Sequence, residues 1–285
     1  MFRCKSIIYG KLNQSIVKRF FQENFKRFTE EEAAYNGVLL RVHDTENYDK
    51  EKFSTDLLKL LEVWKSSQKR SAFLQIPISM SHCISVAAKL GFEYHHATGN
   101  VAVLSSWLEE HTDSKIPSYS NHTVGVAGAC YNELTSELLV VQDKGMYSKW
   151  WKFPGGYSNK GEFIKGETAI REIKEETGII AEFKSVLSLR HLHNGLFDQS
   201  DIYFICRLLP ITYDIKHCTD EIQDCRWIDL DTLLHMNDAS QYVKLVCRLI
   251  LDGKSCDFKN VDIVENEMVN WVLKKRMKLY HRPLN

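Results

Sequence analysis

The sequence predicts an α+β protein with two domains, and three observations support this fold class. Residues 31–110 alternate short apolar runs with two amphipathic helical patterns, as small α+β units do. Residues 122–250 contain mainly strand patterns, interrupted by one strong helical pattern at 167–177. Between these regions, residues 111–121 are polar, rich in Ser and without periodicity, so we expect a linker there. A chain of 285 residues is long enough to bury two modest cores.

The first domain shows helix and strand signals in a clear order. Apolar residues recur at helical spacing from Phe53 to Trp64, which predicts an amphipathic helix that ends near Ser67. Ser81 is placed to cap a second helix, and Gly91 to end it. In chain order we expect a strand at 37–42, the first helix, a strand at 72–76, a helix at 81–90 and strands at 92–96 and 101–107.

The second domain is dominated by strands. We expect strands at 124–131, 138–142, 183–189, 202–209 and 225–228, with the helix at 167–177 between the second and the third. We also expect the tail at 251–285 to be helical, with a helix around 261–279 that contains the basic run 274–276.

Charge and cysteine content exclude several classes of partner. Lys+Arg and Asp+Glu number 37 each, so the neutral chain gives no general reason to expect a nucleic acid partner. No apolar run approaches the ~20 residues of a membrane span, and no membrane association is expected. The eight cysteines include no C-x-x-C pair, so we expect free and mostly buried thiols.

The N-terminal segment, residues 1–30, is unusually basic at its start. Residues 1–22 contain five Lys or Arg and no acidic residue, with scattered apolar partners. This pattern fits a mitochondrial transit peptide or an ordinary basic helix, and the two readings stand level. The expected location is therefore cytoplasmic or mitochondrial, with the nucleus also open.

Three glutamates on the 167–177 helix predict a metal site. At about 100° per residue, Glu175 lies about 60° to one side of Glu172 and Glu176 about 40° to the other. Arg171 precedes Glu175 by four residues and can orient it. Three crowded carboxylates suit a hard divalent cation, Mg²⁺ or Mn²⁺, which lowers the pKa of a bound water. The alternative is a solvated acidic face.

A short turn before this helix argues against the solvated face. Pro154 ends a strand, and Gly155 and Gly156 let the backbone take conformations that other residues avoid, so a main-chain carbonyl of either glycine can approach a metal. Gly178 is placed to end the helix. Together, the turn and the carboxylate helix form a specific pattern.

That pattern resembles the signature of the Nudix hydrolases, G-x5-E-x7-R-E-U-x-E-E-x-G-U, where U is a bulky aliphatic residue. Residues 171–179 match its second half position for position. Gly156 and Glu162 match its first half, but eight residues instead of seven separate Glu162 from Arg171. We expect this extra residue to be absorbed around 163–165, before the carboxylate helix. The resemblance makes Glu162 a further candidate for the metal site.

The resemblance extends over most of the chain. Segments 124–129, 139–143, 200–204 and 226–230 are similar to a branch that contains the animal Nudix motif 6 proteins and the plant ADP-ribose/NADH pyrophosphatases. The resemblance implies a Nudix fold, a mixed sheet between helices in an α/β/α sandwich, after a small acetyltransferase-like domain. That domain lacks the acetyltransferase loop that binds coenzyme A, so acetyl transfer is not expected.

The same resemblance implies hydrolysis of a nucleoside diphosphate linked to another group. ADP-ribose or NAD(H) is the first expectation for this nucleotide substrate, while dinucleoside polyphosphates, coenzyme A derivatives and capped RNA stay open. Glu221, six residues before Trp227, stands where many family members have a further glutamate. The general base is Glu172 or Glu221, and the sequence does not choose between them.

Four more residues are candidates for substrate binding. Arg190, His193 and Phe197 belong to a long polar segment between two expected strands, and Trp151 precedes the Pro-Gly-Gly turn. Cations could contact phosphate and aromatic rings could stack on a base, although such side chains more often lie on the surface or in the core without a role in binding.

Two rival functions also stand: a binding module that senses ADP-ribose or NAD with negligible hydrolysis, and an interaction protein that forms a homodimer through the first domain.

Overall fold

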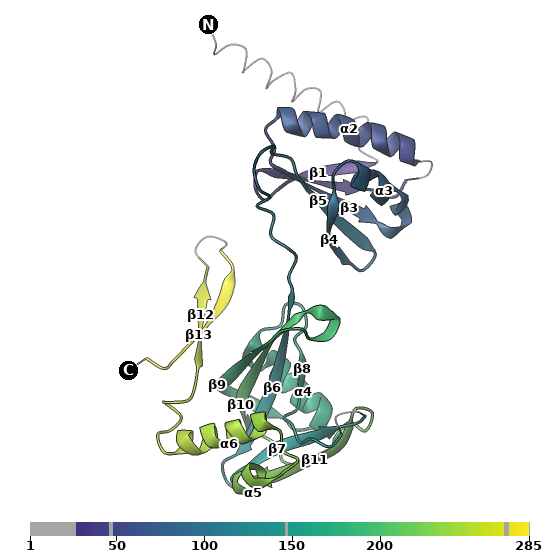
Figure 1. Cartoon of the computed structure of the whole chain (residues 1–285). Helices are drawn as coiled ribbons and strands as arrows, with labels where there is room; N and C mark the ends of the chain where they lie inside the picture. Colours follow the sequence, from purple (N-terminus) through teal and green to yellow (C-terminus); the bar gives the residue numbers. More distant parts are fainter. Residues whose placement is uncertain (1–26, 46–47, 146–147, 271–273, 285) are drawn as a thin grey trace. The chain divides into compact units, whose positions relative to one another are not determined.

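The computed structural model describes residues 27–45, 48–145, 148–270 and 274–284. The chain divides into two compact units, Met1–Ser120 and Asn121–Asn285 (Figure 1). The division falls at the end of the expected linker. The basic segment proposed as a transit peptide lies almost wholly outside the described residues.

The described part of the first unit forms one five-stranded mixed sheet and two α-helices. Its sheet has the order β1-β2-β3-β5-β4, in which β2 and β3 are parallel and the other neighbours are antiparallel. The elements are β1 (Phe28–Ala33), β2 (Gly37–Val42), α2 (Lys50–Ser66), β3 (Ser71–Pro77), a 3₁₀ turn (Ile78–Met80), α3 (His82–Lys89), β4 (Glu93–Thr98) and β5 (Val101–Trp107). All the elements expected in this domain are confirmed.

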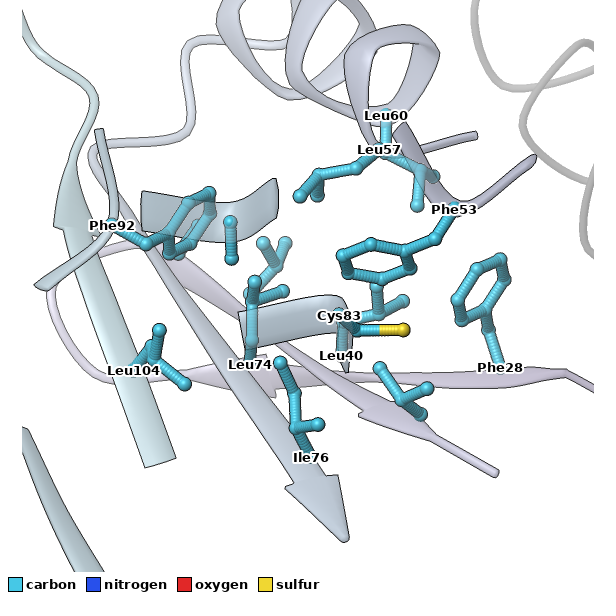
Figure 2. Close-up of a cluster of buried hydrophobic side chains, with 14 of the residues drawn as sticks. Phe28, Leu40, Phe53, Leu57, Leu60, Leu74, Ile76, Cys83, Phe92 and Leu104 are labelled. Atoms are coloured by element: carbon cyan, nitrogen blue, oxygen red, sulfur yellow. The ribbon is translucent and has the colours of Figure 1, made fainter. Parts of the chain in front are cut away.

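The core of the first unit joins the helices to the sheet. Phe53, Leu57 and Leu60 of α2 point towards Leu40 and Leu74 of the strands (Figure 2). The side chain of Asp49 caps α2 by accepting a hydrogen bond from the backbone N–H of Lys52 (2.8 Å). Ser81 stands at the N-cap of α3, but its side chain makes no capping bond there.

The first domain begins earlier than residue 31. Strand β1 starts at Phe28, whose side chain is 2% exposed in the core. The strand sequence Phe-Thr-Glu-Glu-Glu-Ala has no alternation of apolar residues. Among the described strands β1 is a polar edge strand, paired with β2. Residues 28–30 therefore belong to the domain and not to the basic N-terminal segment.

The second unit contains a six-stranded mixed sheet. Its order is β11-β7-β6-β10-β9, with β8 also paired to β6; β6 and β10 are parallel and the other pairs are antiparallel. The elements are β6 (His122–Asn132), β7 (Glu137–Asp143), β8 (Gly155–Tyr157), a π-helical turn (Ile164–Thr168), α4 (Ala169–Thr177), β9 (Ala181–Leu192), a 3₁₀ turn (Leu196–Asp198), β10 (Ser200–Pro210), β11 (Ile222–Asp229), α5 (Leu230–His235), α6 (Gln241–Lys254), β12 (Val264–Val269) and β13 (Arg276–His281).

Helices cover both faces of this sheet. Along β6, Ala127 and Ala129 pack in the cluster that contains α5 and α6, whereas Val126 and Cys130 pack in the cluster that contains Ile173 of α4. Both faces are buried, which explains why β6 is almost continuously apolar. The expected mixed sheet between helices is confirmed (Figure 1).

The expectation of a helical tail at 251–285 is wrong. Helix α6 continues to Lys254, and the helix expected around 261–279 is instead the antiparallel hairpin β12–β13. Lys278 of β13 bonds across the hairpin to Glu265 (3.1 Å) and Glu267 (3.0 Å) of β12. Cross-strand pairs of this kind stabilise a hairpin even when Glu, Lys and Met are good helix formers.

The remaining expectations concern the membrane and the cysteines. Among the described residues, no helix has the length and apolar character required to cross a bilayer. The seven described cysteines are free, and five of them are buried: Cys83, Cys130, Cys206, Cys225 and Cys247. Burial raises the pKa of the Cys130 thiol to about 12, so this thiol is protonated and packs as an apolar group.

Candidate active site

The acidic residues lie on α4, which packs its apolar side on the sheet. Ile173 is fully buried against β6, and the neighbouring turns carry Glu172, Glu175 and Glu176. The helix ends at Gly178, which has a left-handed backbone (φ 75°) and donates its N–H to the Lys174 carbonyl (3.0 Å). The expected role of Gly178 is confirmed.

A π-helical turn absorbs the extra residue between Glu162 and Arg171. The turn spans Ile164–Thr168 and leads directly into α4. A π-helix closes each turn with one more residue than an α-helix, so it takes up one residue without changing the register that follows. The insertion is therefore absorbed before the carboxylate helix, as expected.

Arg171 connects the acidic residues. Its Nε donates to Glu162 (3.0 Å), and its Nη1 donates to both Glu172 (2.8 Å) and Glu175 (3.0 Å). Its Nη2 also donates to the main-chain carbonyl of Tyr157 (3.3 Å). Hydrogen bonds to Glu162 raise the pKa of Arg171 further, so it stays charged. The expected orientation of Glu175 by Arg171 is present, and the contact with Glu162 was not foreseen.

Glu162 is held by hydrogen bonds from within the protein. Besides Arg171, the Asn159 backbone N–H (2.8 Å) and the Thr168 hydroxyl (3.0 Å) donate to its carboxylate. These bonds, the Arg171 bond first, lower the pKa of Glu162 to about 2. Because both oxygens already accept hydrogen bonds, the geometry favours Glu162 as the residue that positions Arg171 over Glu162 as a direct metal ligand.

Glu176 is the most buried acid of the site. It is 6% exposed, and its Oε2 has no hydrogen-bond partner. Burial raises the pKa of Glu176 to about 8, and the nearby Glu172 and Asp143 act in the same direction. Burial likewise raises the pKa of Glu172. A buried carboxylate oxygen without a partner, next to a second acid, fits a site that a divalent cation would complete.

The other two glutamates lie nearer to solvent. The Glu175 side chain is 60% exposed, and Glu221 is exposed immediately before β11. Both charges act on Glu172 and raise its pKa, so both lie near it. Within the described residues, no group of three or more acidic, His or Cys side chains is already closed into a metal cage. The acids therefore lie near Glu172 without forming a closed set of metal ligands.

Gly155 and Gly156 are required for close approach, and the expectation of an unusual backbone conformation is wrong. Neither has a positive φ, and both belong to strand β8 beside β6. A Cβ on Gly155 would lie 2.4 Å from the Val126 carbonyl oxygen, and one on Gly156 would lie 2.6 Å from Oε1 of Glu172. The Gly155 backbone lies near Glu176 and lowers the pKa of its carboxyl group, against the larger effect of burial. The absence of a Cβ thus lets the main chain of Gly156 approach Glu172 closely.

An aromatic and cationic pocket of about 460 Å³ includes Lys152 and Asp143, two residues that lie near Glu176, in its lining. Lys152 and Asp143, paired at 2.6 Å, line it and also act on the charge of Glu176. The Arg190 guanidinium lies over the ring of Tyr203 (4.8 Å to the centroid) and over that of Tyr242 (5.2 Å). The full lining is Ala127, Asp143, Trp150, Lys152, Phe153, Arg190, Tyr203, Ile205, Ser240 and Tyr242. Such a pocket can accept a flat base between rings and an anion beside a cation.

Only one of the four candidate substrate-binding residues lines this pocket. Arg190 does, held by Asp201 at 2.5 Å. Trp151 is 3% exposed in the core, and its neighbour Trp150 is the one that reaches the pocket. His193 bonds to Ser200 (2.9 Å) and Phe197 is 86% exposed, both away from the pocket lining. Trp151, His193 and Phe197 do not line this pocket, and their role in substrate binding stays a prediction.

Sequence reasoning missed three pocket residues that come from separate elements. Lys152 follows the Trp pair, Tyr203 lies on β10, and Tyr242 lies at the start of α6. The alternation of Tyr203 with the buried Ile205 on one strand is a signal that both face the same side of the sheet. No sequence signal placed Tyr242, because α6 itself was not expected.

Comparison with known proteins gives consistent similarities. A family model described as a NUDIX domain matches residues 121–249, and one described as a Nudix hydrolase domain matches residues 28–108. Human nucleoside diphosphate-linked moiety X motif 6 is 40% identical over 248 residues, covering 86% of this chain and 78% of the human protein. Nudix hydrolase 7 of Arabidopsis thaliana is 33% identical over 223 residues, covering 75% of this chain and 78% of the plant protein. Among solved structures, the MutT protein of Methanosarcina mazei Go1 is 22% identical with a TM-score of 0.40, covering 49% of this chain and 99% of that chain.

Proposed function

The chain belongs to the Nudix hydrolase family, as its sequence resemblance predicted, and from this premise we propose that it hydrolyses ADP-ribose or NAD(H) at the pyrophosphate with Mg²⁺. The reaction class, hydrolysis of a nucleoside diphosphate linked to another group, follows from the family. The choice of substrate and of metal is our proposal. The observation that supports it most is the aromatic and cationic pocket beside Glu176.

Glu172, Glu175 and Glu176, with a main-chain carbonyl of Gly155 or Gly156, would hold Mg²⁺ or Mn²⁺. The unpartnered Oε2 of Glu176 supports this assignment, because a bound cation would satisfy a carboxylate that is otherwise buried at a cost. A bound divalent cation supplies charge neutralisation at the phosphates and a water of lowered pKa. Arg171 keeps Glu172 and Glu175 aimed at one side of α4.

Glu172 and Glu221 are both placed to accept a proton from an attacking water. Burial raises the pKa of Glu172, which improves it as a base near neutral pH. Glu221 is exposed and lies near enough to act on Glu172. We keep both as candidates for the general base.

In the adjoining pocket, the aromatic rings would take the adenine and the cations would take phosphate. Tyr203 and Tyr242 present ring faces around Arg190, and Trp150 is half exposed at the rim. Every nucleobase has a face that can stack on such rings, so adenine fits the pocket and so would other bases.

A substrate panel at fixed Mg²⁺ tests this proposal. We expect ADP-ribose or NADH to give the highest kcat/KM, with AMP as one product, against diadenosine polyphosphates, coenzyme A and capped RNA. A Tyr242→Ala variant should raise KM for the preferred substrate more than it lowers kcat, since the ring contributes binding and touches no acid. Higher turnover of another compound would contradict the substrate assignment.

The second candidate function is a module that binds ADP-ribose or NAD without turnover. The altered spacing after Glu162 was its main support, and the π-helical turn removes that support because Arg171 still reaches Glu162. The same panel distinguishes the two, since a binding module would bind ADP-ribose and release no AMP. A homodimer through the first unit stays a prediction, and light scattering would test it.

A further inference from the structure

A second hollow, of about 610 Å³, adjoins the aromatic and cationic pocket at the start of α6. Because a nucleotide is proposed to bind there, the first pocket is called the nucleotide pocket below. Trp150 and Tyr242 line both hollows, so the two cavities meet at these rings. Both rings are about half exposed, at 51% and 46%. The lining of the second hollow is Trp150, Asn237, Ala239, Gln241, Tyr242, Lys244, Leu245 and Arg248.

The charge of this second hollow is entirely positive. Lys244 and Arg248 stand four residues apart on α6, so they share a face of the helix. Asn237 and Gln241 add amide donors, and no carboxylate lines the hollow. By contrast, the larger hollow between α4 and the β12–β13 hairpin mixes its cations with Glu167, Glu175, Glu182 and Glu267.

Neither Lys244 nor Arg248 has an acidic partner among the described residues. Of the ion pairs formed between described residues, none includes either side chain. Other cations nearby are already neutralised: Arg190 bonds to Asp201 and Lys152 to Asp143. The two α6 cations are thus available for an anion from outside the chain.

We propose that this hollow is an anion subsite that binds a phosphate carried on the ribose of the nucleotide substrate. This inference rests on the proposed function, because it assumes that the nucleoside occupies the adjoining pocket. Lys152 and Asp143 of the first pocket lie near Glu176, Trp150 and Tyr242 line both hollows, and Lys244 and Arg248 line the second hollow but not the first. The order is therefore Glu176, the first pocket, the two rings and then the two cations. A phosphate at the cations would therefore lie across the nucleoside from the pyrophosphate that is cleaved.

The chemistry of the side chains suits a phosphomonoester. An Arg guanidinium donates to two phosphate oxygens at once, and a Lys four residues away adds a point charge. A nucleotide with an additional 2′- or 3′-phosphate carries such a group, whereas its unphosphorylated counterpart does not. The subsite would favour the nucleotide whose additional phosphate reaches Lys244 and Arg248.

Two matched ligand pairs test the subsite: NADPH against NADH for a 2′-phosphate, and coenzyme A against dephospho-coenzyme A for a 3′-phosphate. Equilibrium binding of the whole chain is measured in EDTA, so that the result does not depend on turnover. The variant is Lys244→Gln with Arg248→Gln, which lowers the net charge by two. The matched control is Lys259→Glu, which also lowers it by two at an exposed residue that lines neither hollow.

We expect the wild type to bind the phosphorylated member of at least one pair about tenfold more tightly. The double variant should lose this ratio, and the control should keep it. A discriminated NADPH pair identifies the 2′-phosphate, and a discriminated coenzyme A pair the 3′-phosphate. The subsite is refuted if neither pair is discriminated, or if the double variant and the control change the ratio equally.

The outcome is separable from that of the proposed function. If the wild type hydrolyses none of the probes with Mg²⁺ but still discriminates a pair in EDTA, the proposed hydrolysis fails and the subsite stands. If it hydrolyses ADP-ribose or NADH but discriminates no pair, the subsite fails and the proposed hydrolysis stands.

Discussion

A single guanidinium organises the acids of the site. Arg171 donates hydrogen bonds to Glu162, Glu172 and Glu175, at 3.0, 2.8 and 3.0 Å. Glu162 fixes one side of the guanidinium, and the other side then holds two of the acids assigned to the metal. Charge alone would not achieve this, because an ammonium group lacks the planar fork of donors.

We expect Arg171→Lys to raise the Mg²⁺ concentration that activity requires and to change the free energy of unfolding little. Lysine keeps the charge but cannot bond all three glutamates, so Glu172 and Glu175 would lose their common orientation. The Mg²⁺ concentration for half-maximal activity should rise about tenfold, the usual scale for residues that orient metal ligands. Arg226→Lys, which lies on β11 beside Asp224, serves as the control and should leave the Mg²⁺ dependence unchanged. An unaltered Mg²⁺ titration for Arg171→Lys would remove its positioning role.

We expect Glu175→Gln to abolish turnover with little loss of stability. Its side chain is 60% exposed, so the amide costs little on folding, but it is a weaker metal ligand than a carboxylate. Loss of such a ligand lowers the rate by on the order of 10³-fold. Glu182→Gln, an equally exposed acid on β9, is the matched control. Single-turnover rates and thermal melts measure the two effects, and activity of Glu175→Gln within threefold of wild type would refute the ligand assignment.

The π-helical turn shows how an element absorbs a change that sequence alone cannot localise. Residue counting places an extra residue somewhere between Glu162 and Arg171, but it does not say whether a loop or a helix contains it. In the structure, Ile164–Thr168 takes it up as a wider turn, and α4 keeps its register. The acids of α4 were therefore predictable from spacing, while the contact between Glu162 and Arg171 was not.

We expect deletion of Lys165 to leave the enzyme active. The deletion would convert the π turn into an α-helical one, and the residues from Arg171 onward would keep their mutual angles. Deletion of Lys174 is the control: it lies inside α4 and would rotate Glu175 and Glu176 by about 100° relative to Glu172. Mg²⁺ binding and kcat should persist in the first variant and disappear in the second. Loss of Mg²⁺ binding on deletion of Lys165 would mean that the turn belongs to the catalytic helix.

The C-terminal elements show where sequence patterns fail. The residues of β12 and β13 are rich in Glu, Lys and Met, which favour helices, and their stability as strands comes from pairing with each other. Ile263 also bridges to Val186 of β9, a contact 77 residues away in sequence. The pocket residues Trp150 and Tyr242 depend on similar long-range packing. Local periodicity predicted most strands and α4, because each of these elements packs its own apolar residues directly on a core, and their spacing marks the buried face.

At the scale of the whole molecule, residue 27 marks where the N-terminal segment ends and the residues that the first unit needs for folding begin. Phe28 is in the core of the first unit, and Arg27 pairs with Asp56 at 3.3 Å. We expect a chain that starts at Arg27 to keep the melting temperature and kcat of the full chain. A chain that starts at Ala34 loses β1 and the buried Phe28, which costs about 3–5 kcal/mol for a large aromatic side chain. Calorimetry of both chains measures this, and equal stability would contradict the role of β1.

Of the two readings of the segment before this boundary, we propose that it is the transit peptide, which would direct the protein to mitochondria. Its first 22 residues combine five basic residues with apolar ones and no acid, which is the composition of a transit peptide. A fluorescent protein fused after residues 1–30 should enter mitochondria. The matched control replaces Arg3, Lys5, Lys11, Lys18 and Arg19 with Gln, which keeps length and apolar content and removes the positive charge, so this fusion should stay diffuse. If both fusions are diffuse, the segment is an ordinary basic stretch. If both enter mitochondria, charge is not the signal, and the transit-peptide prediction fails in its physical basis.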